Sequence, residues 1–175
     1  MLTEEQKHDI GDYVRKILSS GIVDKKVCDT PLEAWDVVNK RFAYATASAP
    51  CLNTTVAATY SPTLVPISTP TFLNGITYLS GSGFSVQVSG QYLVMGQAYF
   101  SPTQTGTCEA MIYVNGIQRA IGYAYCSSAY LFTVPFVAQI LNLNAGDNVE
   151  LYAAFSNSST QTVTGANSYL SIAKV

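Results

Sequence analysis

The sequence predicts a mainly β protein, an antiparallel jelly-roll sandwich that follows a short N-terminal α-helical adaptor. Three observations support this prediction. Only 11% of the 175 residues are charged, and 15 of these 20 charged residues lie before residue 44. Beyond residue 83, short runs rich in Val, Ile, Tyr, Phe and Thr alternate with turn residues. No helical pattern interrupts these runs, and many short strands in series are typical of a β-sandwich or jelly roll.

The uneven distribution of charge divides the chain into modules. Soluble domains ordinarily carry roughly 25% charged residues. We predict a helical adaptor over residues 1–45, a Ser/Thr/Pro-rich connector with the first strands over 46–83, and a jelly-roll head over 84–175. The head domain is expected to begin near residue 54. Low charge suits a head that packs against copies of itself, because charge is depleted in interface cores; a simply neutral surface is the alternative.

Two helices are predicted in the adaptor. The first covers residues 3–18, where Thr3 and Gln6 can form a capping box and apolar residues recur at helical spacing. The second begins at Thr30-Pro31, a capping residue followed by a proline suited to the first helical position. Neither helix is long enough to be stable alone. Each must therefore bury its apolar stripe on its partner helix, on sister chains or on a larger assembly.

Strands are predicted along the rest of the chain. In the connector, Thr54–Tyr60 and Gly75–Leu79 can form short or edge strands, because four prolines interrupt that segment. Asn115-Gly116 is the strongest hairpin signal, since both central residues of such a turn need a positive φ. Asn144–Asp147 marks another tight turn. The strands expected in the head are Phe84–Val88, Gly90–Phe100, Cys108–Val114, Ile117–Tyr125, Ala129–Leu141, Asn148–Ser156 and Ser168–Lys174.

Several of these strands are apolar on both sides. In the run that begins at Gly90, one side presents Tyr92 and Val94, and the other side presents Leu93 and Met95. An antiparallel strand that is buried on one face only should be polar on the other face. We therefore expect the outer faces to contact other subunits; a covering loop is the alternative.

Disulfides and metal sites are not expected. No apolar run is long enough to span a membrane, and the N-terminus does not resemble a signal peptide, so we expect thiols rather than disulfides. The single His8 lies far from the four cysteines, whose spacing matches no zinc pattern. A two-residue turn between the central strands would place Cys108 opposite Tyr123. A bridge from Cys108 to Cys126 would therefore need a bulge or a register change.

From about residue 72 onward, the chain resembles the tumour-necrosis-factor (TNF) and complement-head jelly-roll superfamily. Phe84–Tyr92 is similar to its opening F-x-V-x-x-x-G-x-Y motif, and Asn115-Gly116 is similar to its mid-domain hairpin. Leu143–Leu151 resembles its L-x-x-G-D-x-V-x-L turn, and Ser168–Ile172 resembles its closing S-x-L-x-I strand. The four motifs occur in the order found in the family. The resemblance implies a compact homotrimer that packs on aromatic and aliphatic faces.

The segment before the head resembles a different group of proteins. Thr30-Pro31 followed by Val38–Phe42 is similar to an element near the start of phage fibre, spike and decoration proteins. In that group the N-terminus anchors to the virion and the C-terminal domain points outward. The resemblance implies that Trp35, Val38 and Phe42 contact other virion proteins; packing within the adaptor is the alternative.

Few residues of the head could perform catalysis. Its acidic and basic side chains are Glu109, Arg119, Asp147, Glu150 and Lys174, with no His, so a Ser or Cys nucleophile would lack its usual base. A pair of glutamates for glycoside cleavage is the enzymatic alternative. We predict no enzyme activity, no cofactor and no metal. The net charge of −2 argues against nucleic-acid binding, and no membrane insertion is expected.

Aromatic side chains are the remaining candidates for a binding surface. Tyr99, Tyr123, Tyr125 and Tyr130 could stack on sugars or anchor a protein partner, or else pack in the core and the trimer. We expect a structural virion protein (a head fibre, a tail fibre or spike, or a decoration protein), made in the host cytoplasm, that displays a homotrimeric head. Its further partner would be a host-surface glycan or protein. A soluble TNF-like ligand or adhesin for a protein receptor is the alternative.

Overall fold

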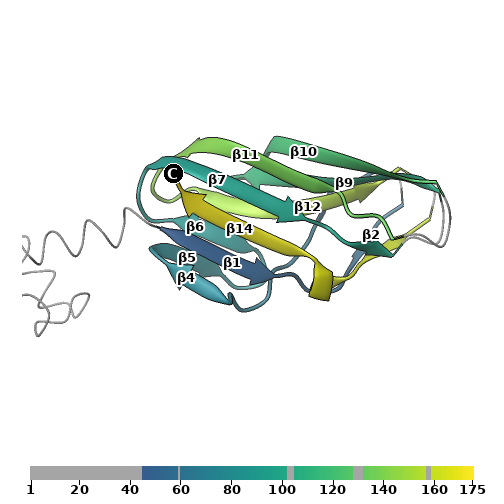
Figure 1. Ribbon diagram of the computed structural model, residues 1–175, viewed down its shortest axis with the longest axis horizontal. Helices are drawn as coiled ribbons and strands as arrows, with labels where there is room; N and C mark the ends of the chain where they lie inside the picture. The colour runs from purple at the N-terminus through teal and green to yellow at the C-terminus, as the bar shows by residue number, and fades with distance from the viewer. Residues whose placement is uncertain (1–44, 59, 102–104, 128–131, 157–158) are drawn as a thin grey trace, which may run out of the picture. The chain divides into compact units, whose positions relative to one another are not determined.

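A computed structural model describes residues 45–58, 60–101, 105–127, 132–156 and 159–175. This part of the chain is mainly β, and its two large antiparallel sheets face each other as a sandwich (Figure 1). The predicted antiparallel β head is therefore confirmed. The adaptor helices predicted over residues 3–18 and from Thr30 to Phe42 lie outside the described residues.

The five-stranded sheet joins segments from both ends of the head, in the order β11-β7-β14-β1-β4. Its strands are β1 (Thr46–Pro50), β4 (Phe72–Asn74), β7 (Gly90–Gln97), β11 (Phe136–Leu143) and β14 (Tyr169–Lys174). β1 lies within the segment predicted as connector and pairs along its whole length with β14, the last strand of the chain (Figure 1). This pairing makes residues 46–50 part of the head.

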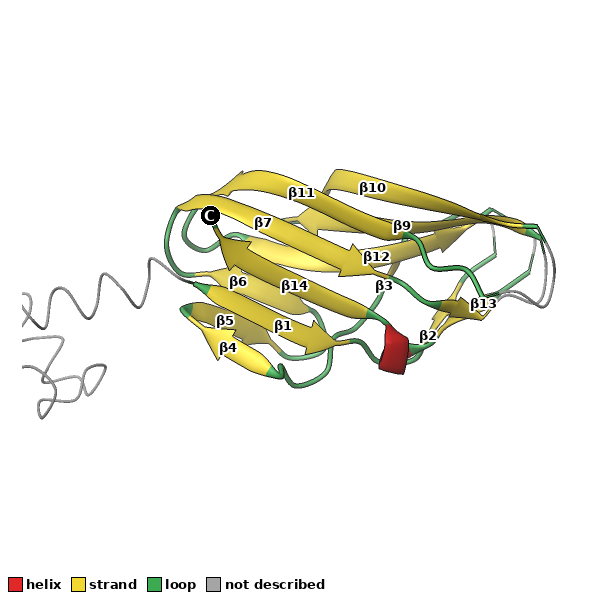
Figure 2. Ribbon diagram, in the orientation of Figure 1, coloured by secondary structure: helices red, strands yellow, loops and turns green. Residues whose placement is uncertain are grey.

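The six-stranded sheet forms the second layer, and five of its strands follow the order β10-β9-β12-β6-β5. These strands are β5 (Ile76–Leu79), β6 (Gly83–Val86), β9 (Gly106–Val114), β10 (Ile117–Cys126) and β12 (Asn148–Phe155), and β3 (Thr63–Leu64) also pairs with β12. A small third sheet contains β2 (Thr54–Val56), β8 (Phe100–Ser101) and β13 (Gln161–Val163). The single short helix of the described residues, η1 (Gly165–Asn167), precedes β14 (Figure 2).

The apolar core fills the space between the two large sheets. Its largest fully buried side chains include Tyr92, Phe84, Phe100, Phe155 and Leu151. Burying a side chain of this size contributes about 1.5–3 kcal/mol to stability. Among these five side chains only Tyr92 has a polar group, and its hydroxyl donates a hydrogen bond to the carbonyl of Val88 at 2.6 Å.

The two predicted turns are tied to each other. At the hairpin between β9 and β10, φ is 52° at Asn115 and 76° at Gly116, which confirms the expected turn. The Asp147 carboxylate accepts hydrogen bonds from the side-chain amide of Asn115 and from the backbone N–H of Asn144, each at 2.8 Å. Two turns that are about thirty residues apart in the sequence therefore fix one end of the six-stranded sheet together.

Two of the strands predicted in the head differ from their predicted bounds by three residues or more, and the others differ by at most two. β11 begins at Phe136 rather than at Ala129, because Pro135 has no N–H to contribute to a ladder; residues 128–131 lie outside the described part. β7 ends at Gln97, and the chain continues as β8 in the small sheet rather than as one strand to Phe100.

A β-bulge in β10 sets the register of the hairpin. After Gln118 the pairing with β9 shifts by one residue, because Arg119 has no opposite partner. The expectation that Cys108 lies opposite Tyr123 is therefore wrong, and Cys108 lies opposite Ala124.

The bulge also decides which side of β10 faces the core. Side chains alternate along a strand, so a shift of one residue exchanges the two faces. Tyr123 and Tyr125 consequently point outward, with exposed fractions of 63% and 71%, whereas Cys126 is buried. Cys108 and Cys126 share the core side of the hairpin, and no disulfide joins the cysteines of the described residues.

The two large sheets meet at one edge through Gly122. A Cβ atom added at this position would overlap the carbonyl group of Phe136, the first residue of β11. The edge strands β10 and β11 therefore approach each other backbone to backbone, which only a residue without a side chain permits.

Gly122→Ala is expected to destabilise the head by about 3 kcal/mol, because one edge strand must move away from the other. Urea unfolding at a fixed protein concentration measures this change. Gln118→Ala is the control, since it alters an exposed position of the same strand and should change stability by less than about 0.5 kcal/mol. Equal unfolding midpoints for Gly122→Ala and the unsubstituted protein would contradict the contact between the two edges.

Candidate functional site

The outward face of the five-stranded sheet carries no acidic or basic side chain. Strand pairing places Ile140, Leu93, Ala173 and Thr46 in one row across four neighbouring strands. The side chains that point outward from the sheet are Phe136, Ala138, Ile140 and Asn142 of β11, Gln91, Leu93, Met95 and Gln97 of β7, Tyr169, Ser171 and Ala173 of β14, Thr46, Ser48 and Pro50 of β1, and Phe72 and Asn74 of β4. We call this surface the uncharged face.

Large apolar side chains of the uncharged face are open to solvent. Ile140 and Phe72 are each 55% exposed, and Phe136 is 47% exposed. Leu93 and Met95 are half-buried among them. On the opposite side of the same strands, Ala47, Val94 and Ile172 are completely buried in the core, whereas Leu73 and Gln139 on the edge strands are exposed. This sheet thus presents large apolar side chains on both sides, and on the outer side they lie among uncharged polar ones.

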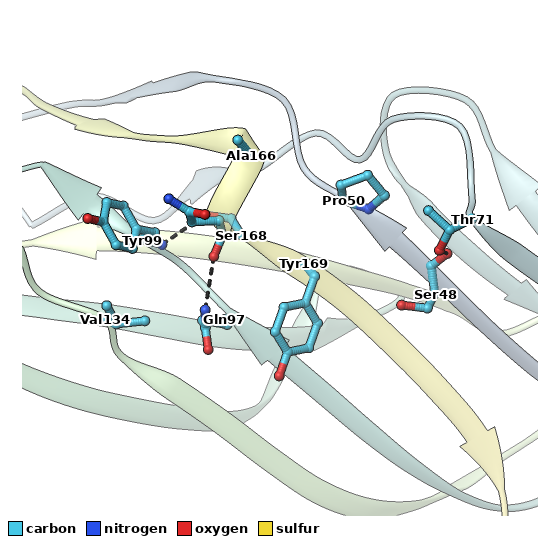
Figure 3. Close-up of a pocket in the computed structure, with 10 residues that line it drawn as sticks. Ser48, Pro50, Thr71, Gln97, Tyr99, Val134, Ala166, Ser168 and Tyr169 are labelled. Carbon is cyan, nitrogen blue, oxygen red and sulfur yellow. Dashed lines mark hydrogen bonds between the residues drawn. The ribbon is translucent and has the colours of Figure 1, made fainter.

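A hollow lies at the end of the uncharged face that is next to η1 (Figure 3). Its volume is about 620 Å³, and residues from five separate segments line it. Seven of its ten lining residues carry a hydroxyl or a side-chain amide, and none carries a carboxylate, an ammonium or a guanidinium group. The hollow is therefore electrically neutral, and its lining combines uncharged polar groups with apolar surface.

Hydrogen bonds hold the wall of the hollow in place. The side-chain amide of Gln97 donates to the carbonyl of Asn167 at 2.9 Å (Figure 3). The buried Ser168 accepts a hydrogen bond from the backbone N–H of Tyr99 and donates one to the carbonyl of Thr164, both at 2.8 Å. These contacts fix η1 against the end of β7.

The outward face of the six-stranded sheet is different, because it is aromatic and acidic. The rings of Tyr113 and Tyr152 lie 4.2 Å apart between their centroids. Glu150 accepts a hydrogen bond from the Ser82 hydroxyl at 2.5 Å. Glu109, of which only 3% is exposed, accepts one from the hydroxyl of Tyr60.

Tyr60 lies over Glu109 in an unusual backbone conformation. Its φ is 60°, which non-glycine residues seldom adopt. The hydrogen bond to the Glu109 carboxylate is the main cause that raises the pKa of Tyr60 to about 12, since losing the phenol proton would leave two negative charges together. Tyr60 therefore supplies the hydrogen-bond donor that a buried carboxylate needs.

The two glutamates are too far apart to act as a glycosidase pair. They lie on neighbouring strands, but Glu150 is opposite Tyr113, which is four residues from Glu109. At about 3.3 Å per residue, this places them about 13 Å apart along the strands. The carboxyl groups of glycosidases are roughly 5–9.5 Å apart.

Cys51 and Cys108 are not suited to nucleophilic chemistry. Burial raises the pKa of Cys51 and of Cys108 to about 12, so both stay protonated near neutral pH. Among the residues that the structure describes, no group of His, Cys, Asp and Glu could hold a metal ion. Within the same ranges, no helix has the length and hydrophobicity to cross a membrane.

The residues predicted from the sequence do not form a single site. Tyr99 lines the hollow and packs against Phe132, with 5.1 Å between the ring centroids. Tyr123 and Tyr125 lie on β10 in the other sheet, so they cannot share a ligand with Tyr99 through one pocket. The predicted residues Trp35, Val38, Phe42 and Tyr130 lie outside the described residues.

Sequence reasoning missed the partners of Tyr99 in the hollow. Gln97, Asn167 and Tyr169 come together only because β7 pairs with β14 and η1 leads into β14. The one sequence signal that could have shown this is the resemblance of Ser168–Ile172 to a closing strand, which pairs with an earlier strand.

Tyr60→Phe is expected to destabilise the head by about 1 kcal/mol near neutral pH, because Glu109 loses its donor while water can partly replace the exposed phenol. The raised pKa of Tyr60 stabilises the folded state below pH 10, and this contribution is lost as the pH rises from about 10 to about 12. The stability difference between Tyr60→Phe and the unsubstituted protein should therefore shrink over that range in urea unfolding. Tyr125→Phe, which removes an exposed hydroxyl, is the control and should change stability by less than about 0.5 kcal/mol near neutral pH.

The head is similar in fold to TNF-family proteins of known structure. A crystal structure of murine APRIL at pH 8.0 has a TM-score of 0.58 at 16% identity, over 75% of this chain and 99% of that chain. Eiger TNF from S. frugiperda has a TM-score of 0.54 at 17% identity, over 76% of this chain and 93% of that chain. No protein-family model and no curated protein matches the sequence. At these identities the likeness shows the fold alone, and it confirms that the head has the TNF-like jelly-roll fold.

Proposed function

We propose that this chain is a non-enzymatic display protein whose jelly-roll head assembles into a homotrimer through the uncharged face. One observation carries the proposal: the outer side of the five-stranded sheet exposes large apolar side chains and has no acid or base. Large exposed apolar patches of this kind mark interaction sites. Interface cores are likewise depleted in charge and enriched in aromatic residues and Met, and the uncharged face presents Phe72, Phe136 and Met95.

The dimensions of the uncharged face suit a specific interface. The five strands are three to eight residues long and contain 30 residues together, and each residue covers about 3.3 Å along its strand and about 4.8 Å across the sheet. This corresponds to about 500 Å² of flat area, and the accessible area of the side chains is larger. Typical stable interfaces bury about 800 Å² on each partner.

A three-fold assembly is supported by the fold and by the resemblance of the head. TNF-like heads, by that resemblance, pack as compact trimers on aromatic and aliphatic faces. The outward side of the six-stranded sheet, with Glu150 and the exposed Tyr123 and Tyr125, then stays free for other partners.

The place of the assembly is proposed from the N-terminal segment. Thr30-Pro31 and Val38–Phe42 resemble the particle-binding element of phage fibre and decoration proteins, so we infer a virion protein anchored through Trp35, Val38 and Phe42. The head would then contact a host-surface glycan or protein. The fold likeness to Eiger TNF and APRIL supports a second candidate, a TNF-like ligand or adhesin that binds a protein receptor.

Light scattering of the purified chain is expected to give about 56 kDa, three times 18.8 kDa. Ile140→Glu should reduce this mass towards that of the single chain, because the assembly would have to bury an unpaired carboxylate. The control is Ile117→Glu, which changes the same residue type at similar exposure (62% against 55%) at the hairpin of the other sheet. A monomeric unsubstituted protein, or equal effects of the two variants, would overturn the trimer proposal.

Deletion of residues 1–43 is expected to abolish incorporation into virus particles while the head keeps its trimeric mass. Negative-stain images of particles labelled at the C-terminus, with and without the deletion, measure this. Trp35→Ala should weaken incorporation in the same direction. Particles that retain the shortened protein at full occupancy would contradict anchoring by the N-terminal segment and favour the ligand candidate.

A further inference from the structure

We propose that the hollow beside η1 is a binding site for a neutral saccharide. The inference rests on the attachment function proposed above and names the class of ligand that the head would recognise. It starts from the lining of the hollow, where uncharged polar groups and two tyrosines surround a volume of about 620 Å³. Small-molecule sites in proteins typically measure about 300–1,000 Å³.

The polar groups of the hollow match the hydroxyl groups of a sugar. The side-chain amide of Asn167 makes no hydrogen bond within the described part of the protein, so it can both donate and accept. Gln97 uses its amide nitrogen to hold η1, which leaves its carbonyl oxygen to accept from a ligand. The hydroxyl of Thr71 donates to the carbonyl of Ser48 at 3.2 Å and can still accept.

Aromatic surface complements these polar groups. The rings of Tyr99 and Tyr169 lie on opposite sides of Gln97 (Figure 3). A tyrosine combines an apolar ring with a polar tip, and a pyranose combines an apolar C–H face with hydroxyl groups at its rim. Val134 and Pro50 add further apolar surface to the wall.

The absence of charge in the lining excludes acidic and basic ligands. None of the ten lining residues is an acid, a base or a His. A phosphate, a sialic acid or an amine would lose its hydration on entering the hollow and would gain no opposite charge, which is unfavourable. A neutral sugar meets no such cost, because its hydroxyls exchange water for amides and hydroxyls.

The position of the hollow is compatible with self-association. The apolar rows of the uncharged face, with Leu93, Met95 and Ile140, lie towards the middle of the strands, whereas the hollow lies at their end beside η1. Interfaces have apolar cores and polar rims that water reaches. The hollow therefore has the composition and the place of a rim site, where each protomer of a trimer would offer one copy.

The test is ligand-observed NMR on the full-length protein with a panel of neutral sugars. The panel contains D-glucose, D-galactose, D-mannose, L-fucose and N-acetyl-D-glucosamine, and N-acetylneuraminic acid is the charged control. Titration to about 10 mM detects dissociation constants near 1 mM. We expect saturable binding of at least one neutral sugar and none of the charged one.

Two substitutions localise the binding. Asn167→Ala removes an exposed amide, and Tyr169→Ala removes one aromatic wall; each should weaken binding about tenfold, which is the loss of one good contact. Gln118→Ala, which removes an exposed side-chain amide of the other sheet, is the matched control for Asn167→Ala and should leave the affinity unchanged. Binding that survives both hollow substitutions, or binding lost equally in the control, would overturn the assignment.

Molar mass measured on the same samples separates this proposal from the trimer. A trimer that binds none of the neutral sugars overturns the saccharide site and leaves the trimer standing. A monomer that binds a sugar with the expected response to Asn167→Ala supports the site and overturns the trimer. A third outcome is that Tyr169→Ala lowers both the molar mass and the sugar affinity, while Asn167→Ala changes neither. The tyrosine then belongs to the subunit interface, and the saccharide site is overturned.

Discussion

The structure of the head depends on one constraint, that a two-layer sandwich can bury only one side of each sheet. In β7 the side chains of Tyr92 and Val94 are completely buried, and those of Leu93 and Met95 point the other way. Both sets are apolar. The buried set contributes to the stability of the single chain, whereas the other set is covered by no second sheet within the described residues and stays partly in water. The sequence thus carries more apolar surface than one copy of the fold can cover, which is the physical reason for assigning the excess to contacts with other copies.

The same constraint gives the bulge at Arg119 its importance. A regular ladder from the Asn115-Gly116 turn would have put Tyr123 on the core side of β10 and left Cys126 outside. One additional residue exchanges these faces, so that small side chains and a thiol fill the core where the two edge strands come together at Gly122. The bulky tyrosines are moved to the surface of the six-stranded sheet. The two outer surfaces of the sandwich consequently differ, one being neutral and apolar and the other acidic and aromatic.

The sequence predicted those parts of the fold that depend on local chemistry. The Asn115-Gly116 turn was predictable because few residues tolerate a positive φ at both positions, and the turn at Asp147 was predictable from its Asn, Gly and Asp residues. The bulge was not, since nothing in the composition near Arg119 distinguishes it from a regular strand. The hollow could not be predicted from the sequence either. Pro50, Tyr169 and Gln97 form one row across three strands, and their neighbourhood comes from pairings between residues up to 119 positions apart.

The absence of charge on the uncharged face links the two properties proposed for the head, self-association and binding of a neutral sugar. A face that must associate with copies of itself cannot carry a net charge of one sign, because identical charges would be brought together around the symmetry axis. Its polar residues must then be amides and hydroxyls, as at Ser48, Gln97 and Asn167. At the edge of such a face, where packing between copies ends, these groups remain accessible and can bind only neutral polar ligands. A requirement for self-association would thereby also select the class of ligand that the rim can recognise.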